Sequence, residues 1–304
     1  MRSVMEQVET MRVAVEKTEK HKSKSLWQHA FETLMRDRYA VAAITIISIY
    51  ALIALLTACG LIAADWKQEV GPSYAPPSLD HIFGTDIFGL SVFAKTLKGA
   101  EVALSVGIVT AIIAVTIGVF LGAIAGYFGG KIDEFIVWFY TTFSSIPYIM
   151  LIVAISFILG KGLVAVYLAL GLTSWENLCR IIRAEVMRHK DREYVHAAKA
   201  IGGGDMRRLF KHIIPNVLHL VIINFSLQFQ TAIKSEVILS YLGLGVQGRP
   251  SWGTMIDDAK LELARGVWWQ LAAATAAMFV IVLAFNILGD ALRDALDPKL
   301  KGKS

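Results

Sequence analysis

Residues 192–216 read REYVHAAKAIGGGDMRRLFKHIIPN and form a polar, basic interruption between two apolar stretches. The pattern predicts two short helices around a turn. In the first helix, Glu193, Ala197, Ala198 and Ile201 recur at helical spacing. The glycines at 202–204 are expected to end it, because glycine tolerates a positive φ. The residue after them, an aspartate at 205, is expected to cap the second helix.

The second predicted helix carries an apolar stripe. Met206, Leu209, Phe210 and Ile213 fall at i, i+3, i+4 and i+7, a spacing that places them on one face. Pro215 is expected to end or kink the helix, because proline lacks a backbone N–H. A small-residue face and an apolar stripe on adjacent short helices are typical of a docking surface. The spacing alone leaves an ordinary connecting loop equally open.

The composition places the whole chain in the membrane class. It has 304 residues, 55% of them hydrophobic, and a mean hydropathy of +0.55, which favours a multi-pass membrane protein over a soluble domain. Its two cysteines, Cys59 and Cys179, indicate neither a disulfide framework nor a metal cluster. The net charge of +5 does not indicate nucleic-acid binding, because the basic residues lie in particular loops. The charged N-terminus lacks the apolar segment of a signal peptide.

We predict an all-α protein with six membrane-crossing helices, at 39–64, 102–130, 135–160, 162–175, 213–233 and 266–289. The fourth is short and is expected to continue as one helix through Leu178 and Ile182. Residues 1–36 form a predicted cytoplasmic tail, and residues 37–300 a predicted transmembrane domain. Within the tail, residues 1–24 are charged and expected to be solvated. Trp27, Ala30 and Phe31 begin either an interfacial helix or an extension of the first span.

The basic residues set the expected orientation. Twenty-two lysines and arginines lie in the segments that share a side with the N-terminus, and seven lie in the opposite segments. By the positive-inside rule, both termini and the 192–216 loop are cytoplasmic. A docking site for a cytoplasmic partner has to be on that side.

The 192–216 loop resembles the EAA loop of permease subunits in bacterial ABC importers. That pattern has Glu-Ala-Ala, a glycine four residues on, and later Ile-x-x-Pro or a close variant. The matching positions are Glu193, Ala197, Ala198, Gly202, Ile213 and Pro215. The fuller form of the loop is similar to the C-type subunit of the dipeptide, oligopeptide and nickel permease family.

Three further segments resemble the same family. They are Gly-Thr-Asp-Ile-Phe-Gly at 84–89, the run from Glu236 to Gly253, and the C-terminal Asn-Ile-Leu-Gly-Asp-Ala-Leu-Arg-Asp-Ala-Leu-Asp-Pro at 286–298. The chain departs from the family pattern at Leu90, Ser91, Glu101, Lys234, Ala274 and Thr275.

The resemblance implies a type I ABC importer permease in a bacterial inner membrane, with 192–216 as its coupling-helix loop. It also implies a heterodimer with a second permease subunit, two cytoplasmic ATPases that bind ATP and Mg, and a periplasmic or lipid-anchored binding protein. No cofactor or metal is expected on this chain. The expected cargo is a di- or oligopeptide, and a nickel chelate or another small solute is the alternative. The implied coupling residues are Glu193, Tyr194, Ala197, Ala198, Gly202, Met206, Leu209, Phe210, Ile213 and Pro215.

Polar residues within the spans are weaker candidates for a translocation pathway or gate. They are Glu236, Ser240, His219 and Asn224. Glu236 could equally be a structural partner for a charge on another subunit. In the second span, Thr110, Ala114, Gly118, Gly122 and Gly126 recur every four residues. Small residues at this spacing allow close helix packing, either static or sliding during transport.

The sequence lacks the residues that other functional classes would need. Glycines at 243, 245 and 248 fit Gly-x-Gly-x-x-Gly, but they follow an apolar helix rather than a strand. There is no Gly-x-x-x-x-Gly-Lys-Ser/Thr sequence, so we expect no nucleotide site on this chain. An intramembrane enzyme would need paired acids, a Ser/Lys pair or a histidine cluster. A channel or secondary transporter gives no reason for the 192–216 loop.

Overall fold

The computed structural model describes residues 26–296, and the expected tail at 1–24 lies outside them. The described part consists of helices joined by short connections and one long loop. The elements are α2 (Leu26–Arg36), α3 (Arg38–Ala58), α4 (Val92–Phe128), α5 (Gly130–Ser144), α6 (Tyr148–Leu159), α7 (Leu163–Thr173), α8 (Glu176–Lys190), α9 (Glu193–Ala200), α10 (Asp205–Arg207), a π-helical turn η1 (Arg208–Ile213), α11 (Ile214–Tyr241), α12 (Trp252–Leu263) and α13 (Trp269–Leu296).

The all-α prediction is confirmed, but the described helices do not reproduce six uninterrupted spans. Four helical segments are long and apolar enough to cross a membrane: α3, α4, α13 and the continuous run Asp205–Tyr241. A fifth crossing is possible if α5 and α6 count as one span, although they meet at 92°. The break lies at Pro147, between the two helices. Proline removes a helical hydrogen bond and disfavours helical geometry in the residue before it.

The fourth expected span is also interrupted, so the prediction of one continuous helix through Leu178 and Ile182 is wrong. α7 ends at Thr173, and α8 begins at Glu176. Between them the Trp175 ring is buried and stacks on Phe139 of α5, with ring centroids 5.5 Å apart. Tertiary burial of this large ring offsets the helical hydrogen bonds lost at the break.

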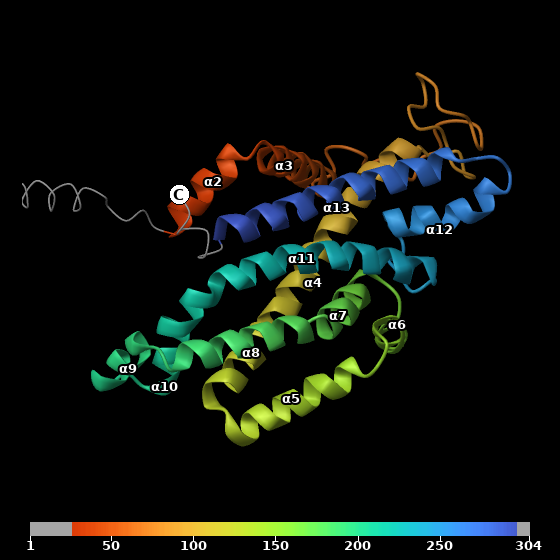
Figure 1. The fold of residues 1–304 in the computed structure, drawn as a ribbon. Coiled ribbons are helices and arrows are strands. Elements are labelled where there is room, and N and C mark those ends of the chain that lie inside the picture. The colour runs from red at the N-terminus through yellow and green to blue at the C-terminus, as the bar shows by residue number, and fades with distance from the viewer. Residues whose placement is uncertain (1–25, 297–304) are drawn as a thin grey trace, which may run out of the picture.

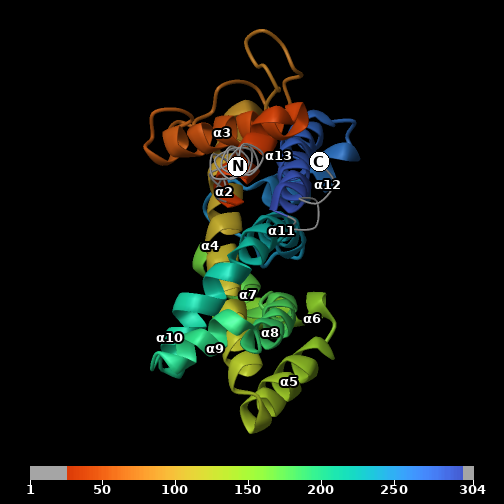
Figure 2. The same cartoon turned by 60° about the vertical axis from the view of Figure 1, so that its left-hand side comes forward.

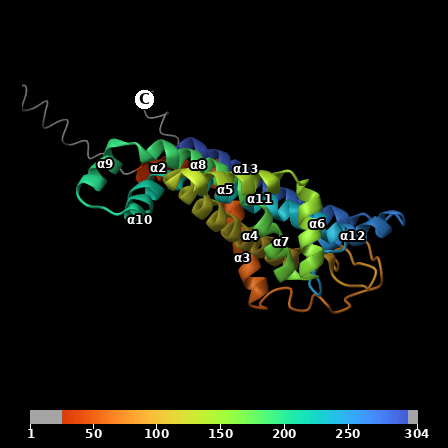
Figure 3. The same ribbon diagram turned by 90° about the horizontal axis from the view of Figure 1, so that it is seen from below.

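α4 is the central element of the fold and contacts helices on all sides (Figure 1). α3 and α13 lie together at one end of α4, and α5 and α8 lie toward its other end (Figure 2). α9 and α10 lie at one end of the elongated molecule, whereas the α3–α4 loop and α12 lie at the opposite end (Figures 1 and 3). α6 runs across the direction of α5 (Figure 3).

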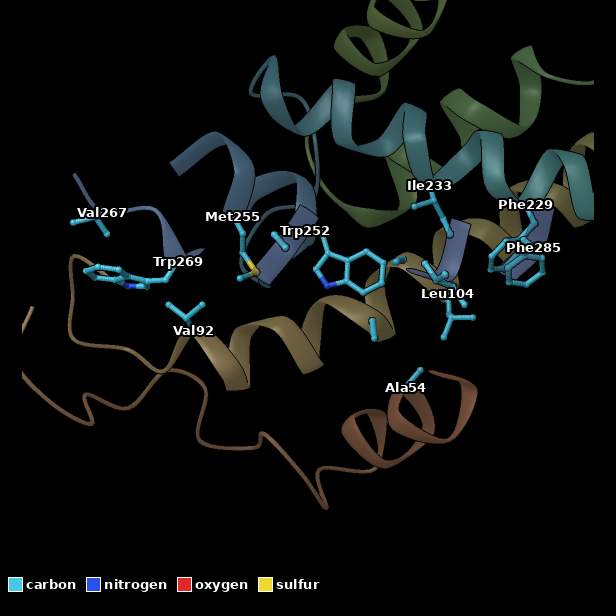
Figure 4. Close-up of a cluster of buried hydrophobic side chains, with 14 residues drawn as sticks. Ala54, Val92, Leu104, Phe229, Ile233, Trp252, Met255, Val267, Trp269 and Phe285 are labelled. Atoms are coloured by element: carbon cyan, nitrogen blue, oxygen red, sulfur yellow. The ribbon is translucent and has the colours of Figure 1, made fainter. Parts of the chain in front are cut away.

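The α12 end of α4 packs in a cluster of large side chains (Figure 4). Trp252 lies at its centre and donates from Nε1 to the carbonyl oxygen of Thr96 at 3.0 Å. Phe229 of α11 stacks on Phe285 of α13, with ring centroids 3.8 Å apart. The absence of a side chain at Gly99 makes room for the Trp252 ring. This cluster ties α11, α12 and α13 to α4.

The other end of α4 packs glycine against backbone. A Cβ added at Gly118, Gly122 or Gly126 would lie 2.8, 2.5 or 2.5 Å from the carbonyl oxygens of Trp175, Cys179 and Arg183, respectively. Both sets of residues are spaced by four, so the two helices run in register. The close packing predicted from the small-residue stripe is confirmed. Its sliding during transport stays a prediction.

A buried polar cluster joins the α3–α4 loop to α4, α12 and α13. Lys95 Nζ lies 2.9 Å from Asp86 Oδ2 and 2.9 Å from Gln270 Oε1. Asp86 Oδ1 accepts from the backbone N–H groups of two loop residues, at 88 and 90. Glu262 of α12 is only 2% exposed, and neither of its carboxylate oxygens has a hydrogen-bond partner among the described residues. The positive charge of Lys95 therefore offsets the negative charge of the buried carboxyl groups of Asp86 and Glu262.

Two of the departures from the family pattern have clear structural roles. Ser91 caps α4, accepting from the backbone N–H of Ala94. Glu101 forms ion pairs with Lys98 of its own helix and with Arg249 in the α11–α12 connection.

Candidate functional site

The 192–216 loop forms the short helix α9 and the start of a longer helix, because α10 continues through η1 into α11 (Figure 1). The prediction that Pro215 ends a short second helix is therefore wrong. Gly202 has a φ of 82° and makes the turn after α9. Gly204, not Asp205, is the N-cap of α10, so the capping prediction for Asp205 is wrong. The Asp205 carboxylate instead accepts from the Tyr127 hydroxyl at 2.8 Å and pairs with Arg208 at 2.5 Å. The aspartate anchors the loop to α4.

The apolar stripe expected along 206–213 is divided between two faces. Leu209 and Ile213 are fully buried, whereas Met206 is 55% and Phe210 44% exposed. A π-helical turn begins at Arg208 and changes the residue spacing at this point. The prediction of one shared apolar face is therefore wrong, and the two buried residues anchor the loop from within.

The remaining coupling candidates are mostly at the surface. Glu193, Tyr194, Ala197, Gly202 and Pro215 are exposed. Ala198 is buried beneath α9 together with Val195. The loop therefore presents a surface with the acid Glu193, small residues and the apolar side chains of Ile201, Met206 and Phe210.

The loop is packed firmly on α4 and α8. Val195, Leu209 and Ile213 join a buried cluster with apolar residues of both helices. The residues contributed by the two helices are Ala123 and Tyr127 of α4 and Leu178, Ile182 and Val186 of α8. A displacement of the loop would consequently be transmitted to the two helices of the glycine seam.

Tyr127 is a functional candidate that the sequence reasoning missed. Its ring lies 5.9 Å from both Lys190 Nζ and Arg208 Cζ. Together with α9 and Asp205, these side chains surround a cavity of about 370 Å³ between α4 and the loop. Tyr127 lies in the Gly-Tyr-Phe-Gly-Gly turn, which the sequence marks only as a tight connection.

The four pathway candidates occupy different environments. Glu236 and Ser240 are buried, and the Ser240 hydroxyl donates to Glu236 Oε1 at 2.7 Å. His219 lies one turn into α11, with Nδ1 3.1 Å from the carbonyl oxygen of Asn216. Asn224 lines a polar cavity between α11 and the α6–α8 segment. The structure does not bring these four residues together.

The described part of the chain contains no group of side chains arranged to bind a metal ion. Between residues 26 and 296, no three His, Cys, Asp or Glu side chains converge as metal ligands. His189, at the end of α8 just before the loop, shares a hydrogen bond of 2.8 Å between Nδ1 and the Tyr194 hydroxyl. Burial lowers the pKa of His189 below its ordinary value, so the ring is neutral near pH 7.

Comparison with known proteins identifies relatives along most of the chain. Residues 118–302 match the family model described as binding-protein-dependent transport system inner membrane component. A dipeptide transport system permease protein of Bacillus subtilis is 36% identical over 283 residues, covering 93% of this chain and 88% of the relative. An oligopeptide transport system permease protein of the same organism is 36% identical, covering 92% of each chain.

A glutathione transport system permease protein of Shigella dysenteriae is also similar. It is 37% identical over 227 residues, covering 74% of this chain and 75% of the relative. The family match, the relatives' coverage and the helical membrane architecture agree. The chain belongs to the family of binding-protein-dependent transport system inner membrane components, the permease subunits of ABC transporters.

Proposed function

We propose that this chain forms half of the translocation pathway of an ATP-driven peptide importer in the bacterial inner membrane. A second permease subunit supplies the other half. Two cytoplasmic ATPases bind ATP and Mg, and a periplasmic or lipid-anchored protein delivers di- or oligopeptides. This chain binds no nucleotide of its own. The names of the three relatives above support a peptide cargo over a nickel chelate or another small solute.

The observation that carries the coupling assignment is the loop's two-sided construction. Leu209 and Ile213 are fully buried against the helix bundle, whereas Met206, Phe210 and Glu193 of the same loop are exposed. Exposed apolar residues beside polar groups are typical of a protein interface. The outward side of the loop would seat in a groove on one ATPase.

The mechanism follows from how the loop is held. When ATP closes the two ATPases, the seated loop moves with its partner. Val195, Leu209 and Ile213 transmit the displacement to α8 and to the end of α4 through the shared core. The spans then tilt, and the pathway between the two permeases opens to the other side. Short packed helices suit this role because they carry force without unfolding.

Charge reversal within the loop tests the assignment in the complete reconstituted transporter. Glu193→Lys is expected to reduce ATP-driven peptide uptake about tenfold, an effect within the range of typical coupling between two sites. It is also expected to abolish the stimulation of ATP hydrolysis by the loaded binding protein. Glu134→Lys is the matched control. It makes the same charge change at an exposed position on α5, outside the loop, and is expected to leave uptake unchanged.

Two results would contradict the proposal. Normal uptake and normally stimulated hydrolysis in Glu193→Lys would remove the loop from coupling. Peptide uptake by proteoliposomes that contain only this subunit would favour a channel or secondary transporter. Crosslinking from Ala197 should capture an ATPase subunit, and a periplasmic position for this residue would refute the proposed orientation.

A further inference from the structure

The break between α7 and α8 faces a polar cavity that the coupling mechanism does not use. The cavity has a volume of about 240 Å³ and lies between this break, α6 and the middle of α11. Figure 1 shows α11 running alongside α7 and α8. The residues that matter to its chemistry are Tyr148, Ser174, Glu176, Asn224, Gln228 and Thr231.

The position of the cavity is informative because α11 belongs to a membrane-spanning segment. Gln228 is partly exposed and Thr231 is exposed on the cavity side of the helix. Polar side chains at membrane depth are costly when they face lipid, so they face protein or a water-filled path. This side of α11 is therefore expected to face protein or water rather than lipid.

The hydrogen bonds within the cavity wall determine which atoms remain for a ligand. The Asn224 amide nitrogen donates to the carbonyl oxygen of Leu220 at 2.8 Å, and the Gln228 amide nitrogen donates to the carbonyl oxygen of Ser174. The Thr231 hydroxyl donates to the carbonyl oxygen of Leu227 at 2.9 Å. Since each backbone oxygen can only accept, these bonds fix both amide orientations. Among the described contacts, the amide oxygens of Asn224 and Gln228 remain free to accept.

Glu176 adds a negative charge to this acceptor-rich wall. Its Oε2 accepts from Ser144 and lies 3.5 Å from Arg180, one helical turn away. Its Oε1 has no hydrogen-bond partner within the described residues. No lysine or arginine lines the cavity. Besides the Asn177 amide, which can donate or accept, the cavity offers a carboxylate and neutral oxygens. Such a set suits a ligand that is cationic and rich in N–H donors.

We infer that this cavity binds the amino-terminal end of the transported peptide. The ammonium group lies at Glu176, and the first backbone N–H groups meet the amide oxygens of Asn224 and Gln228. The volume holds about eight waters at roughly 30 Å³ each, which suits the first residue or two rather than a whole oligopeptide. The peptide's carboxylate is repelled by the same wall. This inference rests on the proposed peptide cargo. It specifies the part of the peptide that this subunit binds.

The test compares one short peptide with its N-acetylated form in proteoliposomes containing the complete transporter. Each peptide is supplied already bound to the same binding protein, and ATP-driven uptake of each is measured. The readout is the ratio of free-amino to acetylated uptake. Because the binding protein is the same throughout, its own preference cancels when variant and wild-type ratios are compared.

Glu176→Gln is expected to lower this ratio about tenfold, the effect of losing one charge-assisted hydrogen bond. Arg180→Gln breaks the same ion pair but leaves the carboxylate, so its ratio is expected to stay at the wild-type value or rise. Glu134→Gln, at an exposed site away from the cavity, is expected to match the wild type. Asn224→Leu is a second cavity variant and is expected to lower the uptake of both peptides about fivefold with the ratio unchanged, because acetylation leaves the backbone N–H groups in place.

The outcomes separate this inference from the function on which it rests. An unchanged ratio in Glu176→Gln, or unchanged uptake of both peptides in Asn224→Leu, overturns the inference alone when the wild type imports the peptide. An equal fall in Arg180→Gln and Glu176→Gln also overturns it, because the lost ion pair would then be the cause. If the wild-type transporter imports neither peptide, the proposed cargo is wrong and the inference fails with it.

Discussion

The two ends of α4 use glycine for opposite purposes. Toward α12, Gly99 and Gly107 make room for the rings of Trp252 and Phe229, which belong to a broad aromatic core. Toward the coupling loop, Gly122 and Gly126 make room for the carbonyl oxygens of α8. The first end is held by many side chains and a buried ion pair. The second is a backbone-to-backbone contact beside the 192–216 loop.

This difference indicates where the subunit is fixed and where it can respond. Large interdigitating side chains resist relative movement, because every displacement opens voids. A smooth glycine seam lacks such side chains, and the two helices it joins also hold Leu209 and Ile213 of the loop. The aromatic end would act as the fixed end during transport.

The sharpest test of the fixed end removes its buried cation. Lys95→Met leaves Asp86 and Glu262 without their compensating charge and is expected to cost about 3–5 kcal/mol. The measurement is the thermal unfolding midpoint of the purified transporter, together with its yield. Lys67→Met, in the exposed part of the α3–α4 loop, is the control and is expected to change stability by less than about 0.5 kcal/mol. Equal losses in the two variants would remove Lys95 from its assigned role.

The glycine seam is tested by adding one methyl group. Gly122→Ala places a Cβ 2.5 Å from a helical carbonyl oxygen and is expected to cost about 1–3 kcal/mol. Gly107→Ala meets the Phe229 ring instead and is expected to cost less, since a side chain moves more easily than a helix backbone. Gly204→Ala, which has open space around it, is the neutral control. Comparable unfolding midpoints for Gly122→Ala and Gly204→Ala would contradict the close packing.

The smallest effect concerns pH at the fixed end. Burial raises the pKa of Glu262 from 4.5 to about 7, with Asp86 and Asp258 adding to this shift and Lys95 opposing it. The folded state therefore holds a proton that the unfolded state releases between these values. Its stabilising contribution is fully present below about pH 4.5 and is lost as the pH rises through about 7.

This contribution is expected to be at most about 3 kcal/mol. The check is the difference in thermal midpoint between wild type and Glu262→Gln, measured across the same pH range. Relative to the variant, the wild type should become more stable as the pH falls from about 8 to about 5. A difference that does not change with pH would show that Glu262 does not titrate in the folded protein.

Local patterns predicted much of the 192–216 loop. Glycine at 202 does adopt a positive φ, and helices do form on both sides of the turn. The patterns failed at Asp205, which resembles a cap but binds Tyr127, 78 residues earlier in the chain. They failed again along 206–213, where the π-helical turn divides an apparently single stripe. A partner that distant and a local change of helical spacing are not visible in residue periodicity.

The sequence by itself determined the helical membrane class, the position of the loop and the close-packed stripe on α4. These depend on hydrophobic length, glycine and helical spacing, which are local properties. Only the tertiary structure decided the break at Trp175, the burial of Leu209 and Ile213, and the gathering of Glu176 and Asn224 around one cavity. These depend on which distant surfaces meet, because burial of a ring or a polar group is stabilising only when its partner from another helix is present.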